Sequence, residues 1–535
     1  MTTNRRIDTY DTTLRDGTQG EGFNLSLQDK LQIAQKLDEL GVDYIEGGFP
    51  LSNPKDEAFF RDIRQMKLQH AKIAAFGMTR RRGVKAEDDP GMRALLSAET
   101  PVVTIVGKTS DKQVLNVLNV SLDENLAMVG DSVRLMKSAG REVIYDAEHF
   151  FDTYRTNREY ALQTLRAALD AGADVLCLCD TNGGNMPELV ADAVRVVREQ
   201  VGGRVGVHTH NDCGLAIANA LAGVHAGSDH VQGTINGVGE RCGNMDLIAL
   251  IANLQLKYQL DCLLPGKLTK LTETSRYVYE LANFAPAHGQ PFVGASAFAH
   301  KGGMHVHAIQ KDTSTYEHIP PESVGNSRKV LVSELSGVSN IATKAGRKFN
   351  LESDKAVLRK VLEKVQDLEN IGYHFESAEA SFELLVRKQI HRHKRFFDLD
   401  HYRVVILRQA NDSPVAEATI KCTVHGAGGS HVPEHRVAEG DGPVDALNSA
   451  LRRALKNHHP AISDVHLVDY KVRVINSREE TGAAVRVVIE CKRTRKDGSK
   501  EHFGTIGVDR NIIDASWQAL VDAYEYHLLH VEEGE

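Results

Sequence analysis

Several features that define whole classes of protein are scarce or missing in this chain of 535 residues. It has 7 cysteines, an odd number, and no Cys-x-x-Cys pair, so the sequence indicates neither a disulfide framework nor a cysteine-built zinc site. Such cysteine usage is typical of a reducing cytoplasmic compartment. No apolar run is long enough to cross a bilayer, and the segment 1–10 lacks the apolar core of a secretory signal.

An excess of positive charge is missing as well. The formal net charge is -8, which predicts binding neither to nucleic acid nor to an anionic membrane surface and leaves small molecules as the expected partners. No Gly-x-Gly-x-x-Gly follows the first predicted strand, which disfavours an open dinucleotide-binding sheet. A Met-Lys-Met biotin-attachment motif is also missing, which disfavours a biotin-linked carboxyl transferase.

One unit recurs in the first half of the chain: an amphipathic helix, a stop of small residues, then an apolar strand. In the segment 26–41, Ser26 and Asp29 form a predicted capping box and Gly41 supplies the helix stop. Strands are predicted to begin near Ile7, Asp43, Lys72, Val102, Glu142, Asp174, Arg204 and Asp229. Eight strands alternating with helices over roughly 250 residues predict an α/β fold, the (β/α)8 TIM barrel.

Polar residues follow most of these predicted strands. The strand ends read DTTLRDGTQ, EGG, YDAEHF, CDTNGG, HTHND and NGVGERCGN. In a TIM barrel the catalytic groups come from the carboxyl ends of several strands. The sequence therefore predicts that acidic, amide and imidazole groups gather at one rim of the barrel.

Two histidines at this rim are spaced as strand neighbours. His208 and His210 lie two residues apart, so their side chains share one face of the strand. Asp16, after the first strand, and Asn244, after the eighth, are the predicted oxygen donors, because those strands adjoin in a closed barrel. Taken singly, Asp16 fits a loop turn and Asn244 a helix cap. Together the four residues favour a divalent-metal site, and such mixed ligands leave magnesium, manganese, zinc and cobalt open.

At this point the sequence is similar to a known family. DTTLRDGTQ, VHTHNDCGLAIANALAG and GTINGVGERCGN resemble the alpha-isopropylmalate, homocitrate and citramalate synthases, metal-dependent TIM-barrel enzymes that carry out Claisen condensations with acyl-CoA. YIEGGFPLSNPKD, FAHKGGMHVHAIQKD and RKVLVSELSGVSNI look most like the citramalate branch. The resemblance covers nearly the whole chain. It implies an acyltransferase that joins acetyl-CoA to pyruvate in the route to isoleucine.

The resemblance also implies roles for single residues. Arg15 would stabilise charge on the keto oxygen of the acceptor and would bind it together with Glu148 and Thr181. His305 and Tyr316 match residues implicated in deprotonating acetyl-CoA, although the resemblance does not settle which group takes the proton. The cysteine of GERCGN is interpreted as a packing residue.

Three domains are predicted: a catalytic barrel over 1–270, helical accessory subdomains over 271–390 and an α+β domain over 391–535. In the last, two strands followed by a helix occur twice, an internal β-β-α repeat. The resemblance implies that this domain dimerises and binds an amino-acid effector, leucine or isoleucine. Gly442 and Pro443, at a helix start, are the candidate effector-binding residues, and an ordinary helix start explains them equally well.

Other functions were weighed against this one. A related synthase could use a bulkier 2-oxo acid, as 2-isopropylmalate and homocitrate synthases do. A metal-dependent lyase could use the same barrel, but the C-terminal repeat argues against a simple lyase. An inactive amino-acid sensor would have no need for the predicted metal ligands.

Overall fold

The structure of the protein, a computed structural model, describes residues 5–331, 338–349, 351, 354–408, 415–426, 429–475 and 482–534. It divides into two compact units. The first comprises Met1–Phe298 and His318–Arg328, and the second comprises Ala299–Glu317 and Lys329–Glu535. The division into three domains with boundaries at 270 and 390 stays a prediction.

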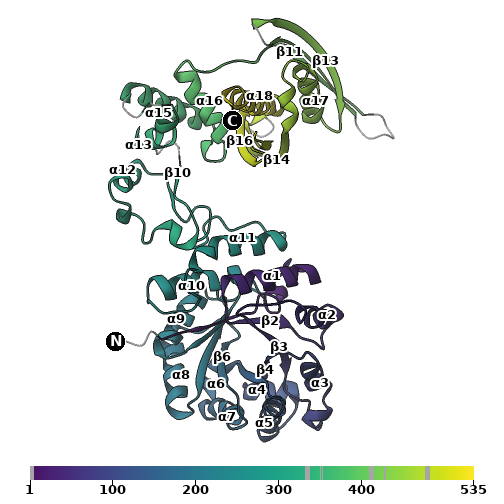
Figure 1. The fold of residues 1–535 in the computed structure, drawn as a ribbon, viewed down its shortest axis with the longest axis vertical. Helices are drawn as coiled ribbons and strands as arrows, with labels where there is room; N and C mark the ends of the chain where they lie inside the picture. Colours follow the sequence, from purple (N-terminus) through teal and green to yellow (C-terminus); the bar gives the residue numbers. More distant parts are fainter. Residues whose placement is uncertain are drawn as a thin grey trace. The chain divides into compact units, whose positions relative to one another are not determined.

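The first unit is a closed parallel barrel (Figure 1). Its strands are β1 (Asp8–Asp11), β2 (Tyr44–Gly48), β3 (Lys72–Met78), β4 (Val102–Lys108), β5 (Glu142–Glu148), β6 (Val175–Asp180), β7 (Arg204–Thr209) and β8 (His230–Gly233). β8 pairs with β1 and closes the ring. The predicted TIM barrel is confirmed, and each strand begins within one residue of its predicted start.

Helices surround these strands. They are α1 (Leu27–Leu40), α2 (Pro54–Ile63), α3 (Pro90–Ser97), α4 (Asp111–Gln113), α5 (Leu122–Ser138), α6 (Phe150–Thr156), α7 (Arg158–Asp170), α8 (Pro187–Gln200), α9 (Ala216–Ala226), α10 (Leu247–Leu256) and α11 (Leu271–Leu281). α1 begins as predicted, because the Ser26 side chain accepts from the Asp29 amide and the Asp29 carboxylate accepts from the Ser26 amide. Gly41 ends it in the left-handed conformation, at φ 90°.

The second unit begins with short elements and helices. These are β9 (Ala299–His300), α12 (Gly303–Lys311), β10 (Lys329–Val330), α13 (Val338–Ile341), α14 (Arg347–Phe349), α15 (Lys355–Asn370) and α16 (Glu379–Gln389). Buried side chains of α15 and α16, among them Leu358, Val361 and Phe382, form one apolar cluster. Part of the motif RKVLVSELSGVSNI lies outside the described residues.

The C-terminal part of this unit contains two three-stranded antiparallel sheets, each followed by a helix. The first repeat is β11 (Phe397–Leu407), β12 (Val415–His425), β13 (His431–Gly440) and α17 (Pro443–Leu455). The second is β14 (Val465–Val474), β15 (Val485–Thr494), β16 (Lys500–Asp509) and α18 (Ile512–Glu533). The predicted α+β repeat is confirmed, but each copy has one strand more than the β-β-α pattern.

The extra strands lack an apolar strand signature. β13 is an edge strand and carries Pro433, which edge strands tolerate. β16 contains Gly504 and Gly507, where an added Cβ would clash with the carbonyl oxygens of Ser377 and Ala515. Close backbone packing therefore requires the two residues that weaken the strand signal.

Within the described residues, no helix combines the length and apolar character needed to span a membrane.

Asp522 on α18 gives this unit a pH-dependent stability. Burial raises its pKa to about 6, and its carboxylate accepts a hydrogen bond from Ser381 at 2.7 Å. The pKa of an aspartate in the unfolded chain is about 4. Between these values the folded protein keeps a proton that the unfolded chain has lost, so stability falls as pH rises from about 4 to about 6 and then levels off.

We expect Asp522→Asn to remove this fall, because the amide does not titrate and its oxygen still accepts from Ser381. The variant should gain up to about 3 kcal/mol relative to the unmodified protein between pH 4 and pH 7.5. Thermal unfolding at several pH values measures the difference. Asp400→Asn, at an exposed position of the same unit, is the control and should show no such gain. Parallel pH curves for Asp522→Asn and the unmodified protein would contradict the assignment.

Candidate functional site

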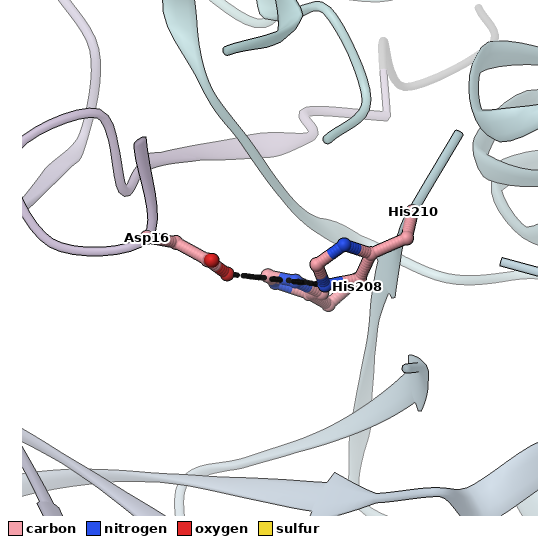
Figure 2. Close-up of side chains that lie close together, drawn as sticks. All are labelled: Asp16, His208 and His210. Carbon is pink, nitrogen blue, oxygen red and sulfur yellow. Dashed lines mark hydrogen bonds and ion pairs between the residues drawn. The ribbon is translucent and has the colours of Figure 1, made fainter. Parts of the chain in front are cut away.

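Three predicted metal ligands lie together at the carboxyl ends of the barrel strands (Figure 2). The Nε2 atoms of His208 and His210 are 3.2 Å apart. The Asp16 Oδ2 atom lies 3.3 Å from the first and 4.0 Å from the second. All three side chains are buried, so the barrel fixes two imidazoles and one carboxylate around a common point.

The charges of this group suit a cation. Burial alone would raise the pKa of Asp16, but the charge of Arg15, with smaller contributions from His208 and His210, holds that pKa well below its usual range. Burial lowers the pKa of His210 to about 4, so its ring is neutral near pH 7. An ionised carboxylate and a neutral imidazole are the forms in which these residues bind metals.

Asn244 comes from the loop after β8. Its backbone forms an isolated antiparallel bridge with His210, which places the two residues side by side. The loop is shaped by glycines in the left-handed region, Gly239 (φ 156°) and Gly243 (φ 90°). A Cβ at Gly239 would clash with the Asn244 amide, and one at Gly243 with the Gly237 carbonyl. The motif GERCGN therefore encodes a backbone that only glycine permits. Its cysteine, Cys242, is exposed, so the predicted packing role is wrong.

Arg15 is held by a buried carboxylate that sequence reasoning did not single out. Its Nε donates to Glu46 Oε2 at 2.6 Å, and its guanidinium lies 3.9 Å from the centre of the Phe76 ring. Glu46 also accepts from the hydroxyls of Tyr10 and Thr12. EGG was noted in the sequence only as the end of a strand. A single acidic residue in an apolar strand has no periodic pattern, so the sequence did not identify Glu46 as the partner of Arg15.

A cavity of about 360 Å³ joins these residues to the predicted substrate-binding ones. Its lining includes Arg15, Asp16, Glu148, Thr181, His208 and His210. The Glu148 carboxylate forms an ion pair with Lys108, and the Thr181 hydroxyl accepts from the His149 amide. Lys108, at the end of β4, was missed, although its place after an apolar strand was a usable signal. The structure thus brings together every predicted site residue of the barrel.

The remaining predicted site residues lie in the second unit. His305 is on α12, and its ring stacks on Tyr316 with ring centres 4.0 Å apart. Gly442 and Pro443 begin α17, where the Asp445 carboxylate already accepts from the Asp441 amide. The Asp445 carboxylate would repel the carboxylate of an amino-acid effector bound in the same turn. The effector role of Gly442 and Pro443 stays a prediction.

A second cavity, of about 410 Å³, adjoins the first and shares Phe49, Met78, Val106 and Lys108 with it. Apolar side chains, among them Leu51 and Val117, and the consecutive arginines 80–82 line it. Arg80 is fixed by Glu124 and Asp131, whereas Arg81 and Arg82 are exposed. Sequence reasoning missed this cavity, because its residues come from several strands, helices and loops that share no motif.

Comparisons with known proteins agree with this architecture. Residues 6–278 match the family model described as HMGL-like. Residues 292–372 match the homocitrate synthase post-HMGL domain-like model, and residues 376–528 match the LeuA allosteric (dimerisation) domain. An (R)-citramalate synthase of Geobacter sulfurreducens is 50% identical over 531 residues, 98% of each chain.

The chain belongs to the HMGL-like family, in its citramalate synthase branch. The (R)-citramalate synthase of Aquifex aeolicus is 48% identical, covering 99% of both chains. That of Synechocystis is also 48% identical, covering 97% of this chain and 95% of its own. The resemblance found in the sequence motifs is therefore confirmed.

Enzymes of the HMGL-like family use a divalent metal, and the residues present here fit one. Among the described side chains, His210 Nδ1 and Asn244 Oδ1 are buried without a hydrogen-bond partner. The donor set of two imidazole nitrogens, a carboxylate and an amide oxygen suits a borderline divalent ion. Asp16, His208, His210 and Asn244 are therefore the residues that would hold it.

The Arg15–Glu46 pair yields a stability prediction. We expect Glu46→Ala to destabilise the protein by about 3–5 kcal/mol, because it leaves the Arg15 guanidinium buried without its carboxylate partner. Urea unfolding followed by circular dichroism measures the shift. Glu159→Ala, which breaks the exposed pair with Arg166, is the matched control and should change little. Equal unfolding midpoints for the two variants would show that the buried pair is not needed for stability.

Proposed function

We propose that this protein condenses acetyl-CoA with pyruvate and water to (R)-citramalate and CoA. The observation that carries the proposal is the cluster of Asp16, His208 and His210 beside Arg15, in a chain 50% identical to an (R)-citramalate synthase. The cavity of about 360 Å³ above this cluster supports a small 2-oxo acid as the acceptor.

The barrel residues orient and activate the acceptor. Asp16, His208, His210 and Asn244 would hold a divalent ion, which would supply Lewis-acid polarisation of the 2-oxo group. Arg15, fixed by Glu46, stabilises the negative charge that develops on the keto oxygen. The Thr181 hydroxyl and the Glu148 carboxylate line the same cavity and bind the acceptor there.

The candidate base is His305 or Tyr316. In our proposal His305, or Tyr316 stacked on it, takes a proton from the methyl group of acetyl-CoA. The methyl carbon then bonds to the keto carbon of pyruvate, and the keto oxygen gains a proton to become a hydroxyl. Water finally attacks the thioester, the carbon–sulfur bond breaks, and CoA leaves as a thiol.

The outer cavity is a candidate site for the CoA arm. Its apolar wall, formed by Leu51, Met78 and Val117, suits the pantetheine chain, and Arg81 and Arg82 are available for phosphate groups. Because it shares four residues with the inner cavity, a thioester placed in the inner cavity would have its long arm in the outer one.

We further propose that the protein is a homodimer joined through its C-terminal domain, with an amino acid as effector. The match of residues 376–528 to a dimerisation domain supports the first part. Four large apolar side chains on β11 and β14 are at least half exposed: Ile406, Leu407, Val468 and Val474. Exposed apolar surface on strands is typical of an interface.

The substrate is tested by following thiol release from acetyl-CoA with a panel of 2-oxo acids. We expect release with pyruvate, its loss with EDTA, and a fall of at least about 10³-fold in kcat for His208→Ala, because the acceptor is no longer polarised. Restoring metal after EDTA should restore the rate.

Two other outcomes have distinct meanings. Release with 2-oxoisovalerate or 2-oxoglutarate but not pyruvate would keep the reaction type and replace the acceptor. The absence of release with every acceptor would contradict the synthase proposal and favour a lyase on the same barrel.

The CoA arm is tested with the double variant Arg81→Ala/Arg82→Ala. We expect its KM for acetyl-CoA to rise about 10-fold or more, because charge-assisted contacts to phosphate are lost. The KM for pyruvate should stay unchanged. Lys112→Ala, an exposed cation on the neighbouring α4, is the control. An unchanged KM for acetyl-CoA in the double variant would place the phosphates elsewhere.

A further inference from the structure

A buried chain of hydrogen bonds leads from the metal-ligand cluster into the barrel interior. The Nδ1 atom of His208 lies 3.0 Å from Gln232 Oε1, and Gln232 Nε2 donates to Asp146 Oδ1 at 2.9 Å. His208 and Gln232 are register partners on β7 and β8, whereas Asp146 belongs to β5. All three are buried, and Gln232 is completely so.

The polarity of this chain is fixed at its inner end. The Gln232 amide donates its NH₂ group to Asp146, and this leaves its oxygen, which can only accept, facing His208. An oxygen at that place requires a proton on Nδ1 of His208. The neutral ring then presents the lone pair of Nε2 to Asp16 and His210, at 3.3 and 3.2 Å.

The opposite polarity would prevent metal binding. If the amide donated to Nδ1, the neutral ring would carry its proton on Nε2, the atom that faces the other two ligands. Hydrogen bonding at the second ring nitrogen is the usual means by which proteins select the tautomer of a histidine ligand. Here that task falls to a neutral glutamine anchored by a carboxylate from a non-adjacent strand.

We propose that Gln232, anchored by Asp146, is a positioning residue that holds His208 in the Nδ1–H tautomer and so sets the metal affinity of the site. The inference rests on the proposed metal-dependent function and deepens it. It assigns Gln232 no contact with substrate.

The surroundings of Asp146 support its role as an anchor. Burial, with a smaller effect of Glu46, raises the pKa of Asp146 to about 7. Its other neighbours include Cys177 and Cys179 on β6, whose thiols lie within 4.8 Å of a carboxylate oxygen. Neither thiol offers a donor as strong as an amide, so the Gln232 NH₂ group is the strongest hydrogen-bond donor among these neighbours of the carboxylate.

The experiment is a Co²⁺ titration of the full-length protein at pH 7.5, monitored by the visible absorption of the bound ion. Gln232→Met keeps the length of the side chain and removes both polar atoms; it should weaken Co²⁺ binding about 10–100-fold and alter the spectrum. Gln232→Glu keeps an acceptor for Nδ1–H, and a proton shared between its carboxyl group and that of Asp146 avoids a second buried charge, so it should bind within about 3-fold of the unmodified protein. Asn326→Leu removes a buried amide that donates to the carbonyls of Phe292 and Gly294, and should not change the affinity.

Each result decides the matter. Unchanged affinity in Gln232→Met overturns the inference and leaves the proposed function standing. If Gln232→Met does not fold, Gln232→Glu carries the test, because a loss of 10-fold or more there would show that His208 needs a donor rather than an acceptor. An unmodified protein that binds no Co²⁺ overturns the metal site itself, and the inference with it.

Discussion

The Glu46 carboxylate is the interaction on which the geometry of the site depends. It is fully buried and accepts from Tyr10, Thr12 and Arg15, so it joins the end of β1 to β2. Tyr10 extends the network to Thr104 on β4 at 2.7 Å. A carboxylate that is buried away from water destabilises the fold unless its oxygens accept hydrogen bonds and a cation lies nearby. The contact between Arg15 and Glu46 therefore fixes Arg15, and with it the neighbouring Asp16, at the wall of the cavity.

A second constraint comes from closing the barrel. Because β8 pairs with β1, residues more than two hundred positions apart become neighbours, as where the Thr13 hydroxyl accepts from the Ile235 amide. The predicted ligands, which lie after β1, at the end of β7 and in the loop after β8, are therefore brought together by strand pairing. The same closure lets Gln232 on β8 reach across the interior to Asp146 on β5.

The features that could be predicted from the sequence are those that recur along the chain or that follow from the spacing of two residues. Strand starts followed from helix stops such as Gly41, and the pairing of His208 with His210 followed from the two-residue period of a strand. Glu46 and Gln232 could not be found in this way, because a polar residue inside a buried strand is recognisable only once its partner from another strand is known. The third strand of each C-terminal repeat was missed for a different reason. Pro433 on β13 and two glycines on β16 weaken the strand pattern, and the glycines are required by close packing against backbone carbonyl groups.

The loop after β8 and the apolar ends of β3 and β4 differ in their freedom to change. An added Cβ would meet the Asn244 amide at Gly239 and the Gly237 carbonyl at Gly243, so neither glycine can be replaced without moving the loop. Met78 and Val106 line both cavities. Substitutions at these two positions can therefore change the shape of both cavities while the cluster of Asp16, His208 and His210 stays intact, so the cavity wall and the cluster can evolve separately.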